Sequence, residues 1–282
     1  MSKKTIAMVH TTIRGDEKLL MDAAKPRNIS LSVVDMREQL LSPYSWRKRY
    51  GVVLERCVST TIGTHAISFF EALGTPVVNN SHTAGICVDK FVTSLVLKKA
   101  KVPTVAFAMA FDEPQALRAV SELGGYPVVI KPASGSWGRL LAKINDRDSL
   151  EAIIEQKMVL GSPSHKALYI QKFVDKPGRD IRVTVVGGNV VCAIYRGSEH
   201  WITNTARGAE AKPCPVDRDL KKISLAASNA VGGGVLGIDV FETDEGYVIN
   251  EINHTVEFKN VQRVTGVDVA GAILEYCQGV SL

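Results

Sequence analysis

The sequence lacks any apolar run long enough to cross a membrane. Its first strand-like run, residues 5–10, is far shorter than the about 20 apolar residues that a spanning helix needs, and no small-residue cleavage site follows it. We therefore expect no membrane span and no signal peptide, and we expect the chain to work in the cytoplasm.

Cysteine is sparse and its spacing is irregular. The five cysteines are odd in number and widely scattered, and they never form a C-x-x-C pair: Cys57, Cys87, Cys192, Cys214 and Cys277. This distribution argues against a zinc site and against a disulfide framework. Each cysteine is expected to be a small buried or surface residue.

Charge and aromatic content are both modest. The net charge is +5, and aromatic residues make up 6% of the chain. A nucleic-acid-binding surface needs a basic stripe with interleaved aromatics or a known module, and neither is present, so we expect no nucleic-acid partner. The densest basic stretch, residues 47–49, is expected to be a solvated loop. The mild positive excess suits nucleotide phosphates or an acidic protein partner.

The length and the order of apolar runs predict several lobes. A chain of 282 residues exceeds the roughly 100 to 200 residues of a usual domain, so we expect two or three lobes with a site between them. In residues 1–88, strand-like runs alternate with helix-like stretches, which predicts a small open parallel α/β sheet. The expected strands are 5–10, 31–35, 51–54 and 76–79, and the expected helices are 16–25 and 65–73.

Two further lobes are expected after residue 88. Residues 89–168 predict a small α+β lobe, which begins with a helix that Val102-Pro103 ends. Its expected elements are 89–100, 104–109, 113–123, 127–131, 140–144 and 147–157, with a glycine-rich loop at 134–138. Residues 169–282 predict a third lobe with strands at 169–173, 180–187, 190–196, 235–241 and 247–252 and helices near 218–230 and 267–277.

A lysine and a glycine-rich loop lie together in the second lobe. The run Val128-Val-Ile-Lys-Pro132 is followed by Ala133-Ser-Gly-Ser-Trp-Gly-Arg139. A lysine at a strand end can reach a phosphate as a fixed cation, and glycines let backbone N–H groups approach phosphate oxygens. The segment matches neither the P-loop nor the dinucleotide fingerprint. By itself it fits either a nucleotide clamp or an ordinary hairpin turn.

Three oxygen-bearing side chains lie on two consecutive strands of the third lobe. Glu251 and Asn253 are two residues apart, so they point to the same face of their strand. Asp239, on the preceding strand, is expected to face them across a hairpin. Two carboxylates and an amide oxygen suit a hard cation such as Mg²⁺, and the trio therefore predicts a metal site.

Cationic side chains lie between the glycine-rich loop and this trio: Lys172, Arg179, Arg182, Arg196 and Arg207. Arg182 alternates with Ile181 and Val183, so it can face a cleft while its neighbours pack. The planar fork of arginine holds a carboxylate or a transferring phosphoryl group through paired hydrogen bonds. A surface salt bridge is the other interpretation, above all for Arg179.

Together these residues resemble the ATP-grasp ligases, and in particular the RimK-related members. Lys90, Lys131-Pro132, the loop 134–138, the segment 171–182 and the trio Asp239, Glu251 and Asn253 occur in the order of that family over nearly the whole chain. Longer strings are similar to the LysX group within the family, namely residues 130–143, Lys176-Pro-Gly-Arg-Asp-Ile-Arg-Val183, residues 200–208 and residues 253–260. The resemblance implies an ATP-grasp fold of α/β and α+β lobes behind an N-terminal pre-ATP-grasp domain.

The resemblance also implies a role for each matching position. Lys90 and Lys131 correspond to ATP-phosphate ligands, and Ser134, Gly135, Ser136, Trp137 and Gly138 to the loop that closes over the phosphates. Gln171, Lys172, Phe173 and Val174 correspond to the hinge that reads adenine through backbone groups, with Asp180 near the nucleotide. Asp239, Glu251 and Asn253 correspond to Mg²⁺ ligands. The phosphate or substrate side is implied for Arg196, Asn204 and Arg207, and the amino-acid pocket for His254, Thr255 and Asn260.

The activity that the resemblance implies is amide-bond formation through an acyl phosphate. The LysX group joins α-aminoadipate to the C-terminal glutamate of LysW, a small acidic carrier protein, in lysine biosynthesis, and Arg182 or Arg207 would stabilise the tetrahedral intermediate. Asn260, after Glu-Phe-Lys, favours this substrate, whereas Val261 departs from the small residue of the group. Glutamate–LysW ligation of the ArgX type, dual specificity, RimK-like addition of glutamate to a ribosomal protein and a non-catalytic nucleotide-binding regulator remain alternatives. Family likeness also implies a homo-oligomer.

Overall fold

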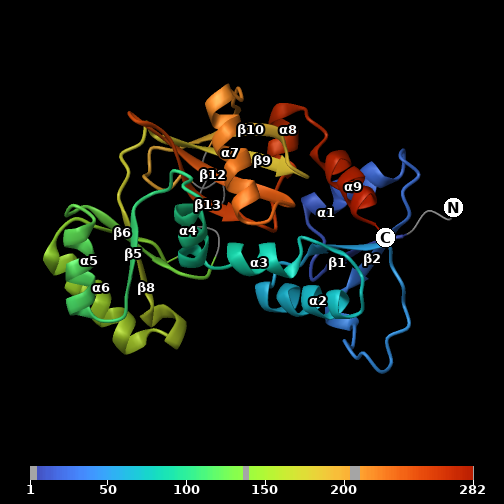
Figure 1. Cartoon of the computed structure of the whole chain (residues 1–282), viewed down its shortest axis with the longest axis horizontal. Helices are drawn as coiled ribbons and strands as arrows, with labels where there is room; N and C mark the ends of the chain where they lie inside the picture. Colours follow the sequence, from blue (N-terminus) through green and yellow to red (C-terminus); the bar gives the residue numbers. More distant parts are fainter. Residues whose placement is uncertain (1–4, 136–139, 204–209, 282) are drawn as a thin grey trace.

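The computed structural model describes residues 5–135, 140–203 and 210–281, which form three sheets (Figure 1). The first sheet contains β1 (Ile6–His10), β2 (Leu31–Asp35), β3 (Val52–Arg56) and β4 (Val77–Val78), all parallel, in the order β2-β1-β3-β4. Its helices are α1 (Gly15–Ala24), α2 (Thr60–Ala72) and α3 (Ser81–Cys87), and η1 (Met36–Glu38) follows β2. The expected open parallel sheet is confirmed. Helix α3 was not expected.

The second sheet is antiparallel and lies at the opposite end of the molecule from the first (Figure 1). After α4 (Lys90–Lys99) come β5 (Phe107–Ala110), α5 (Glu113–Glu122), β6 (Val128–Pro132), β7 (Ala142–Ile144), α6 (Arg147–Leu160), η2 (Pro163–Lys166) and β8 (Leu168–Lys172), with strand order β5-β8-β6-β7. Strand β8 lies between β5 and β6. The strand expected at 169–173 therefore belongs to the second sheet and not to the third lobe, because pairing partners decide which sheet a strand joins.

The third sheet has the order β11-β10-β9-β12-β13, with every pair antiparallel. Its strands are β9 (Arg179–Val186), β10 (Asn189–Gly197), β11 (Glu210–Pro213), β12 (Val235–Thr243) and β13 (Gly246–Asn253), and its helices are α7 (Arg218–Ala230) and α8 (Lys259–Thr265). Strand β11 and helix α8 were not expected. Helix α7 packs against strands β9, β10 and β13 and covers one face of the sheet.

The first and third sheets share one hydrophobic core. Ile6 and Leu54 of the first sheet cluster with Val235 of the third, and the last helix, α9 (Val269–Val280), lies in this cluster through Ile273 and Leu274. The second sheet instead has a core of its own, built from buried residues between Ala110 and Ile170. The second lobe is therefore a separate packing unit.

Aspartate side chains start many of the helices. Asp89, Asp112, Asp146, Asp217 and Asp268 each accept a backbone N–H in the first turn of α4, α5, α6, α7 and α9. Such caps satisfy N–H groups that have no partner within the helix. The cap at Asp89 also fixes where α4 begins, and so places Lys90 at the first helical position.

The segment that enters the second sheet is bonded to β13. Ile249 N–H donates to the Pro103 carbonyl at 2.9 Å, and the Ile249 carbonyl accepts from Val105 N–H at 3.2 Å and from the Thr104 hydroxyl at 2.9 Å. Among the described residues, no helix is long and apolar enough to cross a membrane. All five cysteines are buried and free, as expected.

Candidate active site

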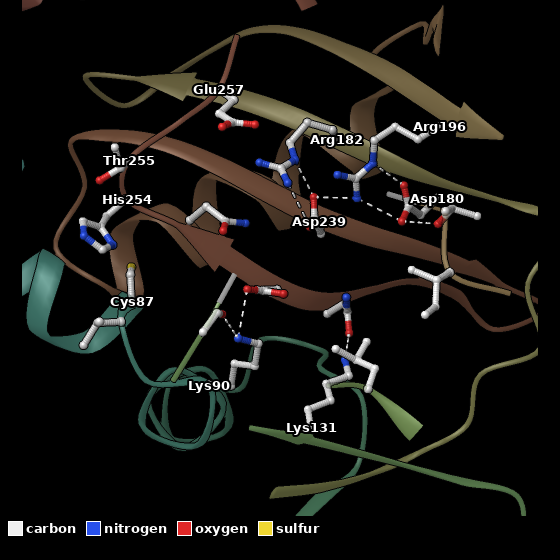
Figure 2. Close-up of a pocket in the computed structure, with 18 of the residues that line it drawn as sticks. Cys87, Lys90, Lys131, Asp180, Arg182, Arg196, Asp239, His254, Thr255 and Glu257 are labelled. Carbon is white, nitrogen blue, oxygen red and sulfur yellow. Dashed lines mark hydrogen bonds and ion pairs between the residues drawn. The ribbon is translucent and has the colours of Figure 1, made fainter. Parts of the chain in front are cut away.

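A pocket of about 250 Å³ lies where the three lobes meet. Its walls include Glu55 from the first lobe, Lys131 from the second, and Asp239 and Glu251 from the third. Figure 2 shows Lys90 and Lys131 on one side and the arginine–aspartate groups on the other. Sequence segments far apart in the chain therefore contribute to one cavity.

The acidic trio expected from the sequence lies on one wall of this pocket. Asp239 of β12 is directly opposite Glu251 of β13, and Asn253 is opposite Gly237. The register shifts after Asp239, because Val240 pairs with Ile249, so β13 carries one extra residue. This bulge brings Asn250 to the pocket as well, next to Glu251. Strand alternation alone did not predict Asn250 as a pocket residue.

Two lysines face this wall. Lys90 begins α4, whose Leu97 packs in the core of the third sheet and not in that of the second, and Lys131 lies on β6 of the second sheet. Lys90 Nζ lies 3.3 Å from Glu251 Oε1 and donates to the Gly135 carbonyl at 2.6 Å. Lys131 Nζ donates to Asn250 Oδ1 at 3.0 Å. Burial lowers the pKa of Lys131 to about 8 against the attraction of Glu251, and repulsion from Lys90 acts in the same direction as burial. Two ammonium groups thus converge where polyphosphate binding was expected.

A chain of ion pairs runs beside the acidic wall. Arg182 Nε lies 2.5 Å from Asp239 Oδ1, and Arg196 Nη2 lies 2.9 Å from the same oxygen. Arg196 also binds Asp180 through Nε at 2.6 Å and Nη2 at 2.9 Å. Although burial opposes both charges, the two guanidinium groups lower the pKa of Asp239, and the two carboxylates raise that of Arg196. Asp180 therefore contacts Arg196 directly and orients it.

The trio has the chemistry of a site for a hard divalent cation. Asp239 Oδ1 is buried and, within the described residues, accepts no hydrogen bond of good geometry despite the two nearby arginines. Asp239, Glu251 and Asn253 offer oxygen ligands to one cavity, and Mg²⁺ prefers such ligands. In the described part of the chain, no cluster of three or more His, Cys, Asp or Glu side chains is placed to hold a metal. The trio differs from such clusters because its third member is an amide.

The expected adenine hinge lies at the end of β8. Gln171 is buried, and its side-chain amide donates to the Tyr169 hydroxyl at 2.8 Å. The N–H groups of Lys172 and Phe173 donate to the carbonyls of Ala106 and Pro127. An adenine ring in this position would therefore use carbonyl groups of the hinge or the N–H of Val174, which also lines the pocket.

The residues that follow Asn253 are held by side chains of the first lobe. Asn79 Nδ2 donates to the His254 carbonyl at 2.6 Å, and the Thr255 hydroxyl donates to Glu55 Oε2 at 3.0 Å. The same pattern continues along the segment: Arg56 donates to the Val256 carbonyl at 2.8 Å, Arg14 to Glu257 at 2.8 Å, and Asp16 accepts the N–H groups of Phe258 and Lys259 at 2.5 and 2.7 Å.

The segment held by these contacts contains the residues expected to form the amino-acid pocket. His254, Thr255 and Asn260 all line the cavity. Burial lowers the pKa of His254 to about 4, so its ring is neutral at pH 7. The first-lobe residues that hold this segment were missed by the sequence analysis, because pairing across about 200 positions leaves no local pattern.

Several expected site residues lie outside the described residues, namely Ser136, Trp137, Gly138, Asn204 and Arg207. The glycine-rich loop is described as far as Gly135. Ser134 forms a bridge with Asp89, and Gly135 has φ +135°, a conformation that favours glycine. Arg179 binds Glu242 at 2.7 Å on the same sheet, so its surface salt-bridge interpretation is the one the structure supports.

Comparison with known proteins assigns the family. A model of the RimK-like ATP-grasp domain matches residues 87–277, and a model of the LysX preATP-grasp domain matches residues 6–86. The chain belongs to the RimK-like ATP-grasp family. The expected ATP-grasp fold is confirmed, and the chain is an ATP-dependent ligase of that fold.

Relatives of this RimK-like ligase match it over nearly its full length. The α-aminoadipate–LysW ligase LysX of Saccharolobus solfataricus is 35% identical over 93% of this chain and 96% of its own length. The glutamate–LysW ligase ArgX of Sulfolobus acidocaldarius is 32% identical, with 96% and 97% covered. The crystal structure of a RimK domain ATP-grasp protein from Sphaerobacter thermophilus has a TM-score of 0.82 at 26% identity, covering 97% of this chain and 99% of that one.

Proposed function

We propose that this RimK-like ligase joins the α-amino group of α-aminoadipate to the γ-carboxylate of the C-terminal glutamate of LysW, with ATP converted to ADP and phosphate. The observation that carries the proposal is that Lys90 and Lys131 face Asp239, Glu251 and Asn253 across one pocket. Similarity to LysX over the whole chain supports the choice of substrates. Asn260, which lines the same pocket, also favours α-aminoadipate.

In the first step, the carrier carboxylate attacks the γ-phosphorus of ATP and an acyl phosphate forms. Lys90 and Lys131 bind the phosphates and balance the charge that spreads over the transferring group. Asp239, Glu251 and Asn253 would hold Mg²⁺, which neutralises phosphate oxygens when bound. Ser134, Gly135, Ser136, Trp137 and Gly138 form the covering loop in this proposal, and the segment Gln171–Val174 holds the adenine.

In the second step, the amine attacks the acyl carbon and phosphate leaves. This attack passes through a tetrahedral oxyanion. Arg182 is suited to stabilise that oxyanion, because its guanidinium group already lies at the acidic wall. Arg207 is a second candidate, and Arg196 and Asn204 belong to the phosphate or substrate side. The reaction needs no side-chain nucleophile.

The proposal extends to the setting of the enzyme. LysW is a small acidic carrier, and a net charge of +5 favours its electrostatic attraction. We propose a cytoplasmic homo-oligomer with no nucleic-acid or membrane partner. The glutamate-specific ArgX type is the second candidate, since ArgX matches the chain over a similar length.

The test is an ADP-release assay with purified enzyme, Mg²⁺-ATP and LysW, in which α-aminoadipate and glutamate are compared. We expect ADP only when both carrier and amino acid are present, with α-aminoadipate preferred. A clear preference for glutamate would assign the ArgX activity instead. Turnover with a ribosomal protein and none with LysW would refute carrier-dependent ligation, and ATP binding without any turnover would indicate a regulator.

A further inference from the structure

Glu55 is a buried carboxyl group of the first lobe that faces the pocket. It is the fourth residue of β3, at the carboxyl end of the parallel sheet, and only 5% of its surface is exposed. Ligands of open parallel sheets bind at this edge. The residue lines the same cavity as the lysines and the acidic trio, but no step described above uses it.

The carboxylate of Glu55 can accept a further hydrogen bond beyond those it already has. Oε1 accepts the Cys57 N–H at 2.5 Å, and Oε2 accepts the Thr255 hydroxyl at 3.0 Å. The Cys57 thiol is a further donor to the carboxylate. A carboxylate has about four acceptor positions, so these three donors leave one for a ligand. A Cβ atom at Gly63 would lie 2.7 Å from Oε1, and the glycine therefore keeps α2 from displacing the carboxylate.

Glu55 also differs from the other pocket carboxylates in its lack of a direct ion pair within the described residues, although the charge of the neighbouring Arg56 acts to lower its pKa. Asp180 and Asp239 bind arginines, Glu251 lies beside Lys90, and Glu257 binds Arg14. Glu55 forms no ion pair with any cationic side chain in the ranges that the structure describes. A buried carboxylate is costly unless a positive charge or hydrogen bonds compensate it. A cationic group of a ligand would complete this site.

We propose that Glu55 binds the ammonium group of the incoming amino acid and accepts its proton, so that the free amine can attack the acyl phosphate. The inference rests on the proposed function, in which an amine is the second substrate. Thr255 follows Asn253 by two residues and bonds to Glu55, which places the carboxylate beside the segment that follows the expected metal ligands.

The ammonium group gives one proton to Glu55, and its nitrogen lone pair then forms the C–N bond to the acyl carbon. The C–O bond to phosphate breaks, and the nitrogen loses a second proton to the departing phosphate. Glu55 returns its proton to solvent when the product leaves. Burial raises the pKa of Glu55, which brings the group closer to the range of an effective base near neutral pH.

The experiment separates amine activation from carboxylate activation in Glu55→Gln. Enzyme, Mg²⁺-ATP and LysW are supplied either with α-aminoadipate or with hydroxylamine, which is already neutral at pH 7 and traps the acyl phosphate as a hydroxamate. We expect ligation of α-aminoadipate to fall about 100-fold, the usual scale of general base catalysis, while hydroxamate formation is unchanged. The ligation defect should shrink as the pH rises, because more of the amine then arrives neutral.

The matched control is Glu71→Gln. Glu71 also lies in the first lobe and accepts a backbone N–H, from Ser81 at 2.8 Å, but it is outside the pocket, and we expect neither reaction to change. A parallel loss of hydroxamate and ligation in Glu55→Gln, or undiminished ligation, would overturn the assignment. If the wild-type enzyme formed no hydroxamate with LysW, the proposed function itself would be wrong.

Discussion

Lys131 shows how burial tunes a single residue. Its pKa of about 8 means that the ammonium group is largely charged at pH 7 and largely neutral at pH 9. Bound phosphates favour the charged form and therefore raise this pKa again. The affinity for ATP should fall as the pH rises through 8, and binding near pH 8.5 should take up a proton.

Calorimetry in two buffers of different ionisation enthalpy measures that proton. Lys131→Arg keeps the positive charge at all these pH values, so its proton uptake near pH 8.5 should vanish. Binding that takes up no proton in the wild-type protein would contradict the lowered pKa of Lys131.

Glu251 is the residue on which the expected metal site depends most. It lies opposite Asp239 and beside Lys90, so Glu251→Ala removes one of the three proposed oxygen ligands and leaves that lysine without its carboxylate. We expect ADP release to fall by at least about 100-fold, as when a charge-stabilising group is removed, with the thermal unfolding midpoint nearly unchanged. Glu242→Ala, on β12 but outside the pocket, is the matched control and should retain turnover.

At the scale of elements, a side chain of α1 forms hydrogen bonds with the start of α8. Asp16 accepts two consecutive N–H groups where α8 begins, although α8 has no side-chain cap of its own. Asp16→Ala leaves both N–H groups unpaired and should cost about 2–3 kcal/mol of unfolding free energy. Because the segment before α8 lines the pocket, the KM for the amino acid should rise more than the KM for ATP.

Denaturant unfolding and steady-state kinetics check this expectation. Asp22→Ala is the control, since Asp22 lies on the same helix and, among the described residues, pairs with Lys25 at the surface. Equal changes in the two KM values would show that Asp16 stabilises the fold without positioning the amino-acid side of the pocket.

Elements with strong local signals were predictable from the sequence. The buried β-branched run of β3 and the helix α7 fall where expected, and Glu251 and Asn253 lie on the strand that was expected to carry them. Helices α3 and α8 have only seven residues each, too few for a clear apolar period. The bulge at Asn250 and the contacts of Glu55 with Thr255 depend on tertiary pairing, which no local pattern encodes.

On the scale of the whole molecule, the distribution of cores predicts uneven stability. The first and third sheets share a cluster with α9, whereas the second sheet has its own smaller core. Units with separate cores can open without global unfolding. We expect amides of β5, β6 and β8 to exchange with deuterium before those of β1, β3 and β9, and Mg²⁺-ATP to slow this exchange. Simultaneous exchange in all three sheets would contradict this division.

The bonds between residues 103–105 and β13 have a mechanical consequence. They attach the second lobe to β13 at Ile249. This residue lies one position before Asn250 and two before Glu251. A rotation of the lobe about this attachment moves distant groups through a wide arc and leaves β13 close to the axis. Opening and closing would then move Lys131 of β6 toward or away from a stationary acidic wall, and the spacing of Asp239, Glu251 and Asn253 would stay the same throughout.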